Sequence, residues 1–173
     1  FSNGGTIALL SQNGADVKII CATKGEAGQV GNPPVCTQEK LGSVREKEHA
    51  VAAYILGVSQ IYYLDLQDGN LSTIGEEEIS KKIKPILEKE KPDIVVTFNK
   101  EGGSLHPDHI TMHKATTIAF TNYVAKTNTS ARLYYTEIPR SLIRKLEKIG
   151  AAYKAFGKIK GTTDNRITTK IDI

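Results

Sequence analysis

Residues 93–110 read DIVVTFNKEGGSLHPDHI, and this stretch decides the fold prediction. Residues 93–98 form a short run of β-branched and aromatic side chains, which is typical of a buried strand. A pair of glycines ends the run, and Pro107 suits the first turn of a helix, which we expect to cover residues 109–125. The junction between this strand and this helix holds three side chains able to bind a metal or move a proton: His106, Asp108 and His109.

The same alternation of strands and helices continues on both sides of this stretch. We expect further strands over residues 15–22, 61–64 and 133–138, and further helices over residues 4–11, 39–56, 76–90 and 141–149. Continuously apolar strands that alternate with helices indicate a mostly parallel sheet covered on both faces. We therefore predict an α/β fold, a Rossmann-like three-layer α/β/α sandwich, and the length of 173 residues fits one domain.

Chemistry is expected at one edge of this sheet. In such folds ligands bind beyond the carboxyl ends of the strands. The loops after residues 22, 64 and 98 all leave from that edge, and each carries acidic, basic or histidine side chains. The first of them, residues 23–37, is long for a compact domain, and loops of that length are usually functional or mobile.

Composition and cysteine spacing exclude several classes of protein. The net charge of +4 is mildly basic, and the lysines are scattered over predicted helix faces without interleaved aromatics, so we expect no nucleic-acid partner. No apolar run approaches the ~18 residues of a membrane span, and no signal peptide is visible. Cys21 and Cys36 lack CxxC spacing, which indicates a reducing compartment and hence the cytoplasm.

The three side chains at the strand–helix junction can be given roles on chemical grounds. Neutral imidazole is a good zinc ligand, and catalytic zinc takes three protein ligands and a water. Asp108 is too close in sequence to His109 for an easy shared site, so we expect its carboxylate to accept the ring N–H of His106. The alternative is that Asp108 only complements the helix dipole and both histidines are surface residues. His49 and His113 are expected on helix surfaces.

Four segments together carry a resemblance to a known family. They are SNGGTIALLSQNGADVKIICATKGEAGQ at residues 2–29, VREKE at residues 44–48, LDLQDG at residues 64–69 and HPDH at residues 106–109. In these segments the chain resembles the LmbE/PIG-L family, from Phe1 to about Ile143. The family consists of zinc-dependent deacetylases that remove N-acetyl groups from glucosamine conjugates, and it includes enzymes of mycothiol and bacillithiol synthesis.

The resemblance implies roles for the three residues of the HPDH stretch. His109 matches a zinc ligand of the family. His106 matches the histidine that stabilises the tetrahedral oxyanion and protonates the leaving amine, and Asp108 matches the residue that fixes it.

Three positions nearer the start of the chain match substrate-binding residues. Arg45 and Asp68 correspond to residues that contact the substrate, and Gln29 stands where the mycothiol-pathway enzyme has a substrate-side glutamate. From the residues alone, Arg45 could equally be a helix charge paired with Glu46 or Glu48. Asp68 could equally be an ordinary residue of an Asp-Gly turn.

The resemblance also implies parts that are not in this sequence. The family's Ala-His-Pro-Asp-Asp-Glu motif, which supplies two zinc ligands and the general base, is expected immediately before Phe1. KIDI at residues 170–173 resembles the start of a strand that a further helix follows. We therefore expect residues 1–173 to be a single deacetylase domain without its N-terminal strand and C-terminal helix, and to hold little metal by themselves. Ser104-Leu105 also replaces the Tyr-Gly of the mycothiol-type enzymes.

These features predict a Zn²⁺-dependent hydrolase that removes an N-acetyl group from a glucosamine-type sugar conjugate. Two alternatives stay open: a non-catalytic module that binds a small molecule or sugar on the same scaffold, and an amidase that cleaves thiol conjugates. We expect a small-molecule substrate and no cofactor beyond one divalent metal. The sequence leaves open whether the protein forms a homo-oligomer.

Overall fold

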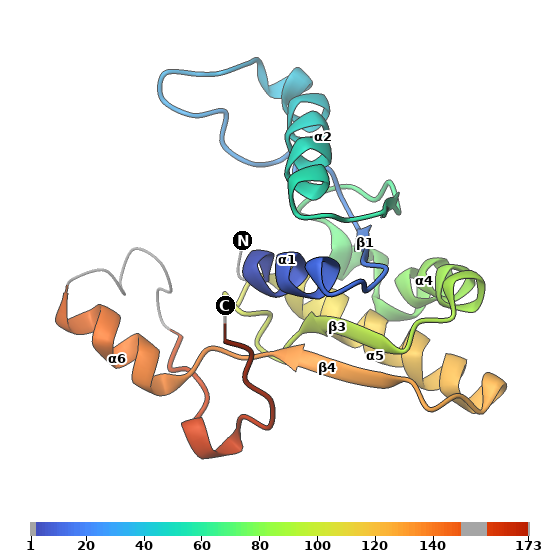
Figure 1. The fold of residues 1–173 in the computed structure, drawn as a ribbon. Coiled ribbons are helices and arrows are strands. Elements are labelled where there is room, and N and C mark those ends of the chain that lie inside the picture. Colours follow the sequence, from blue (N-terminus) through green and yellow to red (C-terminus); the bar gives the residue numbers. More distant parts are fainter. Residues whose placement is uncertain (1–2, 150–158, 173) are drawn as a thin grey trace. The chain divides into compact units, whose positions relative to one another are not determined.

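The structure, a computed structural model, describes residues 3–149 and 159–172 (Figure 1). It divides into two compact units, of which the first comprises Phe1–Asn70 with Ile171–Ile173 and the second comprises Leu71–Lys170. No helix in the described residues is long and apolar enough to cross a lipid bilayer.

The first unit has two parallel strands and two helices. They are α1 (Gly4–Gln12), β1 (Lys18–Cys21), α2 (Gln38–Ile55) and β2 (Gln60–Tyr63). Lys18 lies opposite Gln60 and Cys21 opposite Tyr63. Gly57 ends α2 with a φ of +75°, as the sequence predicts, because this left-handed position favours glycine. Its carbonyl oxygen accepts a hydrogen bond of 2.8 Å from the hydroxyl of Ser11.

The second unit holds another pair of parallel strands. Its elements are α3 (Leu71–Ile74), α4 (Glu76–Glu90), β3 (Ile94–Phe98), α5 (Pro107–Thr127), β4 (Arg132–Thr136), α6 (Arg140–Lys148) and the 3₁₀-helix η1 (Asp164–Arg166). Ile94 lies opposite Arg132 and Phe98 opposite Thr136. Both sheets are parallel in the described residues, which confirms the prediction of an α/β protein with parallel strands.

The core of the second unit lies between α4 and α5. On α4, Ile79, Ile83 and Leu87 are buried at intervals of four residues, the spacing that places side chains on one face of a helix. On α5 the buried positions include Ala115, Ala119 and Tyr123. Burying each large apolar side chain contributes roughly 2 kcal/mol, so this contact fixes α5 and with it the loop that leads into it.

The predicted elements between residues 4 and 149 are all present, with ends that differ by at most three residues. The helix α3 is one turn long and was not predicted. The strand expected at residues 170–173 is wrong for residues 170–172, which are irregular, and Ile173 lies outside the described residues. Backbone pairing occurs earlier instead, where Pro139 and Thr162 form an isolated parallel bridge.

Candidate functional site

Asn99 holds the loop between β3 and α5. Its side chain is buried, and its Oδ1 accepts the backbone N–H groups of Glu101 at 3.2 Å and Gly103 at 3.0 Å. Its backbone oxygen accepts the N–H of Gly102 at 2.9 Å. An asparagine side chain often satisfies the N–H groups of a tight turn in this way. Asn99 therefore sets the path of the loop that precedes the histidines, a role that the sequence analysis missed.

Gly102 lies directly against the first turn of α5. Its φ is +65°, and a Cβ added there would lie 2.8 Å from the Cβ of His109 and 2.9 Å from the nitrogen of Ile110. Only glycine permits this approach of two backbones. As a result, the carbonyl oxygen of Gly102 lies 3.0 Å from Nδ1 of His109.

The contacts of the His109 ring fix its tautomer. The ring stacks on Phe98 with 4.3 Å between centroids and 8° between planes, and its Nδ1 lies near Gly102 O and 3.2 Å from Ser104 Oγ. Because a carbonyl oxygen can only accept, Nδ1 carries the proton and Nε2 carries the lone pair. This is the arrangement that a metal-binding histidine requires. Nε2 makes no hydrogen bond within the described residues, so His109 fits a metal ligand.

His106 has the opposite tautomer. It is the N-cap of α5, and its Nδ1 accepts the backbone N–H of Asp108 at 3.2 Å. The neutral ring therefore carries its proton on Nε2. The rings of His106 and His109 lie 5.1 Å apart, so the loop presents one N–H donor beside one lone pair. Pro107 occupies the first helical position, as predicted.

The carboxylate of Asp108 is buried and points to a different partner from the one expected. Its Oδ1 accepts the backbone N–H of Leu71, the first residue of α3, at 3.1 Å. The sequence predicted that this carboxylate accepts the ring N–H of His106. Instead the bond at Nδ1 of His106 comes from the backbone of Asp108, because the ring caps the helix and a cap accepts from the first-turn amides.

In the first unit, two carboxylates join the loop after β1 to the turn after β2. Asp68 accepts from the hydroxyl of Thr23 at 3.2 Å and from the N–H of Ala27 at 3.0 Å. Glu26 in return accepts the N–H of Asp68 at 2.8 Å and the N–H of Lys24 at 3.2 Å. Both oxygens of Asp68, the predicted substrate contact, thus bond to this loop. Glu26 was missed, although an acid inside a glycine-rich loop is a signal for such a bond.

Arg45 braces the same loop. Its Nη1 donates to the carbonyl oxygen of Gly25 at 2.8 Å and its Nη2 to that of Gln29 at 3.5 Å. A Cβ on Gly28 would lie 2.6 Å from the Cζ of Arg45, so the guanidinium packs flat on this glycine. Within the described residues Arg45 forms no ion pair with an acid, so the alternative of a pair with Glu46 or Glu48 is wrong. The side chain of Gln29 is exposed.

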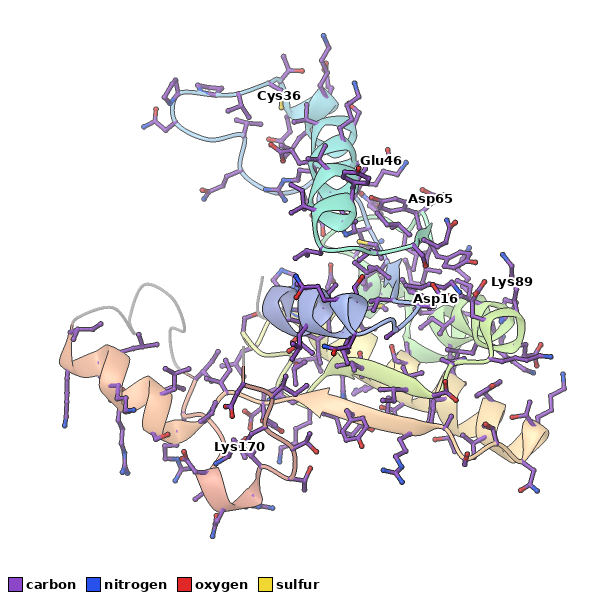
Figure 2. All side chains as sticks on the ribbon, in the orientation of Figure 1. Asp16, Cys36, Glu46, Asp65, Lys89 and Lys170 are labelled. Atoms are coloured by element: carbon purple, nitrogen blue, oxygen red, sulfur yellow. The ribbon has the colours of Figure 1, made fainter. Side chains whose placement is uncertain are left out.

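Lys24, and not Arg45, forms the ion pair with Glu46. Its Nζ lies 3.1 Å from Glu46 and 3.4 Å from Asp65. Figure 2 labels these two acids, Glu46 on α2 and Asp65 after β2. The ion pair with Glu46 raises the pKa of Lys24. A cavity of about 370 Å³ adjoins these residues, and its walls include Gly42 and Gln67. None of the predicted substrate-binding residues lines this cavity.

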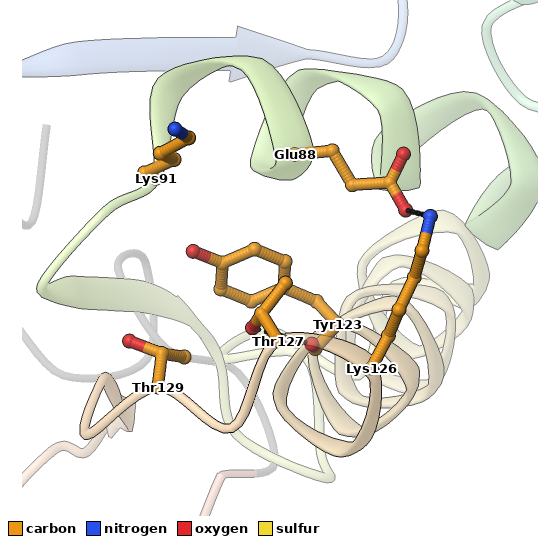
Figure 3. A pocket seen from close by; sticks show the side chains of 6 residues that line it. All are labelled: Glu88, Lys91, Tyr123, Lys126, Thr127 and Thr129. Carbon is orange, nitrogen blue, oxygen red and sulfur yellow. Dashed lines mark hydrogen bonds and ion pairs between the residues drawn. The ribbon is translucent and has the colours of Figure 1, made fainter.

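A second cavity, of about 530 Å³, lies at the C-terminal ends of α4 and α5 (Figure 3). Lys126 and Glu88 form an ion pair of 2.8 Å on its wall, beside the ring of Tyr123. Lys91 caps α4 in a left-handed conformation. Lysines at helix C-termini offset the negative end of the helix dipole, which explains their presence here. No predicted site residue belongs to this cavity.

The other histidines have structural partners. His49 lies 2.9 Å through Nδ1 from the hydroxyl of Tyr63. His113 donates from Nδ1 to the carbonyl oxygen of Phe98 at 2.8 Å and packs against Tyr135. Both were expected on open helix surfaces, and both are half-buried instead. Across the described residues, no group of three or more His, Cys, Asp or Glu side chains could hold a metal ion.

Parallel strands, with two histidines where the loop after β3 enters α5, define an α/β protein with a histidine pair beyond a strand end. The family model of PIG-L, described as GlcNAc-PI de-N-acetylase, matches residues 1–120. The chain belongs to this family, which confirms the resemblance seen in the sequence.

Relatives with names and a solved structure agree with this membership. A 1D-myo-inositol 2-acetamido-2-deoxy-alpha-D-glucopyranoside deacetylase of Saccharomonospora viridis is 29% identical over 201 residues, covering 99% of this chain and 73% of the relative. A probable N-acetyl-alpha-D-glucosaminyl L-malate deacetylase 2 of Bacillus anthracis is 35% identical over 106 residues, covering 61% of this chain and 46% of the relative. The structure of N,N'-diacetylchitobiose deacetylase from Pyrococcus horikoshii superposes with a TM-score of 0.62 at 28% identity, covering 87% of this chain and 62% of that one. All three names describe deacetylases of N-acetylated amino sugars.

Proposed function

We propose that the protein is a Zn²⁺-dependent deacetylase that removes the N-acetyl group of a glucosamine-type sugar conjugate. The observation that carries the proposal is the pair of histidine rings 5.1 Å apart, in which Nδ1 of His106 accepts a backbone N–H and Nδ1 of His109 faces a carbonyl oxygen. Family membership and the names of the relatives support the substrate class. The fold proposed with this function is the Rossmann-like three-layer sandwich, which the parallel strands of each unit support.

His109 supplies one metal ligand through Nε2. A bound zinc ion would polarise the amide carbonyl and lower the pKa of a bound water toward about 7. The further ligands and the general base are those that the family resemblance implies upstream of Phe1. The bond from Nδ1 to Gly102 keeps the His109 ring in orientation, and its stacking on Phe98 limits rotation.

His106 acts on the oxygen and nitrogen of the scissile amide. Its Nε2–H donates to the oxygen on which negative charge develops during attack. Protonation of the nitrogen requires the imidazolium form, so the ring first takes up the proton released by the attacking water. It returns to neutral imidazole as the C–N bond breaks and the amine leaves in neutral form. Asp108 contributes by position, because its backbone holds the His106 ring while its carboxylate ties the start of α5 to α3.

Arg45, Asp68 and Gln29 are proposed as substrate-binding residues. Two of the five N–H groups of Arg45 bond to the loop, and the other donors have no partner within the described residues. Asp68 uses one lone pair on each oxygen, and a carboxylate has about four acceptor sites. The exposed amide of Gln29 can donate or accept.

The test is amine release from N-acetylglucosamine conjugates, measured with zinc supplied and again after a chelator. The expected result is zinc-dependent release by the protein extended upstream of Phe1, with residues 1–173 alone holding little metal and showing little activity. Cleavage of a thiol-conjugate amide with no N-deacetylation would identify the amidase instead. Saturable binding of the sugar without turnover would identify the binding module. Stoichiometric zinc and full activity in residues 1–173 would contradict the proposed ligand set.

A further inference from the structure

Asn99 links the loop after β3 to the residues that follow β4. Its Nδ2 donates to Oε2 of Glu137 at 2.9 Å, and the same oxygen accepts from the hydroxyl of Thr162 at 2.6 Å. Glu137 directly follows the last residue of β4. The backbone of Thr162 is itself fixed, because its N–H donates to Ile138 at 2.9 Å and its oxygen accepts from Arg140 at 2.8 Å. One carboxylate therefore anchors the Asn99 amide at the neighbouring strand end.

The anchor decides which way the Asn99 amide faces. A carboxylate can only accept, so Glu137 holds the NH₂ end of the amide. The oxygen end must then face the loop, where it takes the N–H groups of Glu101 and Gly103. A flipped amide would place an oxygen against the carboxylate and an NH₂ group against two N–H groups. Asn99 is 7% exposed, so water has little access to repair such a mismatch.

The fixed loop in turn fixes the ring of His109. The N–H of Gly102 donates to the backbone oxygen of Asn99, and this turn aims the Gly102 carbonyl at Nδ1 of His109. The bonds run continuously from Glu137 through Asn99 and Gly102 to the imidazole. All of these residues lie in the second unit.

We propose that Glu137 and Asn99 are positioning residues that set the tautomer of His109 and so decide which ring nitrogen is offered to a metal ion. Neither residue is proposed to contact the substrate or the metal. The consequence for catalysis rests on the proposed function, whereas the tautomer can be measured without it.

The decisive variants reverse the pair. Asn99→Asp keeps an oxygen toward the loop but places two carboxylates face to face. Glu137→Gln in the same chain restores one donor and one acceptor with their direction reversed, since the new amide at position 137 can then donate to the new carboxylate at position 99. Thr162→Val is the matched control, because it removes a different bond to the same Glu137 oxygen and leaves the amide pair intact.

The measurement is the protonation of the two His109 ring nitrogens in the metal-free protein, read from ¹⁵N NMR and assigned with a His109→Gln variant. Wild type and Thr162→Val are expected to show a protonated Nδ1. Asn99→Asp is expected to shift His109 toward protonated Nε2. In the protein extended upstream of Phe1 it is expected to weaken Zn²⁺ binding by about 10- to 100-fold, the range for a lost partner of a ligating histidine. The double variant is expected to recover the protonated Nδ1 and the Zn²⁺ affinity of the wild type.

Two results would overturn the inference: an unchanged tautomer in Asn99→Asp, or a folded double variant that does not recover. If Asn99→Asp fails to fold, Glu137→Ala decides the matter, because this side chain is exposed and its loss frees the amide to flip. An unchanged tautomer in Glu137→Ala also overturns the inference. A shifted tautomer, together with no deacetylase activity in the zinc-supplied protein extended upstream of Phe1, would leave this inference standing and remove the proposed function.

Discussion

The loop after β3 and the loop after β1 each follow one strand of a parallel pair, and both are rich in glycine. Their polar side chains, however, make different kinds of contact. In the loop after β3, His106 and His109 each bond to the backbone through Nδ1 and keep Nε2 without a partner in the described residues. Around the loop after β1, by contrast, Arg45, Asp68 and Glu26 bond to backbone groups of this loop and of the turn after β2. Polar residues at a strand end thus divide into those that hold the chain and those that keep a group available for chemistry.

The glycines differ in the same way. Gly102 meets the backbone of α5, which cannot move without disturbing the helix. Gly28 meets the guanidinium of Arg45, the far end of a flexible side chain. A side chain at position 102 would therefore clash with a rigid helix, whereas one at position 28 would displace a side chain that can move away.

The largest expected effect tests the rigid contact. Gly102→Ala is expected to lower the free energy of unfolding by about 3 kcal/mol, from left-handed strain of about 1 kcal/mol and a backbone clash of about 2 kcal/mol. Gly103→Ala is the control, since its φ of +69° is similar but an added Cβ has nothing within 4 Å. Its expected cost is about 1 kcal/mol. Urea unfolding measures both, and equal losses would show that strain alone matters.

The second prediction separates the two histidines. In the zinc-loaded protein extended upstream of Phe1, His106→Ala is expected to lower kcat by about 100-fold, as for a lost oxyanion donor, while zinc remains bound. His109→Ala is expected to lose the zinc as well. Metal content and turnover, measured on the same samples, check the two roles. A comparable loss of zinc in both variants would contradict the assignment by tautomer.

The third prediction concerns the hydrogen bonds that the Asp68 and Glu26 carboxylates accept in the first unit. Asp68→Ala is expected to cost about 1 to 2 kcal/mol of stability, because it removes two hydrogen bonds to a charged group that is partly exposed. Chemical denaturation gives the value. Glu26→Ala serves as the comparison, since it removes the reciprocal pair of bonds and should cost a similar amount. A much smaller cost for Asp68 would favour a substrate role over a structural one.

The smallest effect tests the movable contact. Gly28→Ala is expected to cost about 1 kcal/mol, because the new methyl group displaces the Arg45 guanidinium and breaks its bond to Gly25. In an Arg45→Ala background the same change should leave the free energy of unfolding almost unaltered. The effects of the two substitutions on stability should therefore be strongly non-additive. A double-mutant cycle by thermal unfolding measures this coupling. Additive costs would mean that Gly28 is restricted by its own backbone.

The sequence was sufficient for the elements and for part of the site. The helix after HPDH and the end of α2 at Gly57 follow from local patterns, since a proline at the first turn and a left-handed glycine act on their own backbone. The closeness of His106 and His109 was predictable for the same local reason, because residues three apart lie on one turn of a helix.

The partners of the polar side chains were not predictable in this way. Glu26 bonds to the backbone of Asp68 across 42 residues, and Asn99 bonds to Glu137 across 38. Such pairs depend on which strands are neighbours, and no local pattern contains that information. The bond from Leu71 to the Asp108 carboxylate was not predictable for the same reason, since the two residues are 37 positions apart and lie in different helices.

The backbone of the β3–α5 loop has a consequence for mirror-image residues. Gly102, Gly103 and Leu105 all have φ between +62° and +69°, the reflection of the right-handed helical region. Residues of D configuration prefer this region, so the loop is a place where D chirality fits and L chirality is strained. D-alanine at position 103, introduced by semisynthesis, should raise the melting temperature by restricting the unfolded chain, whereas L-alanine there should lower it.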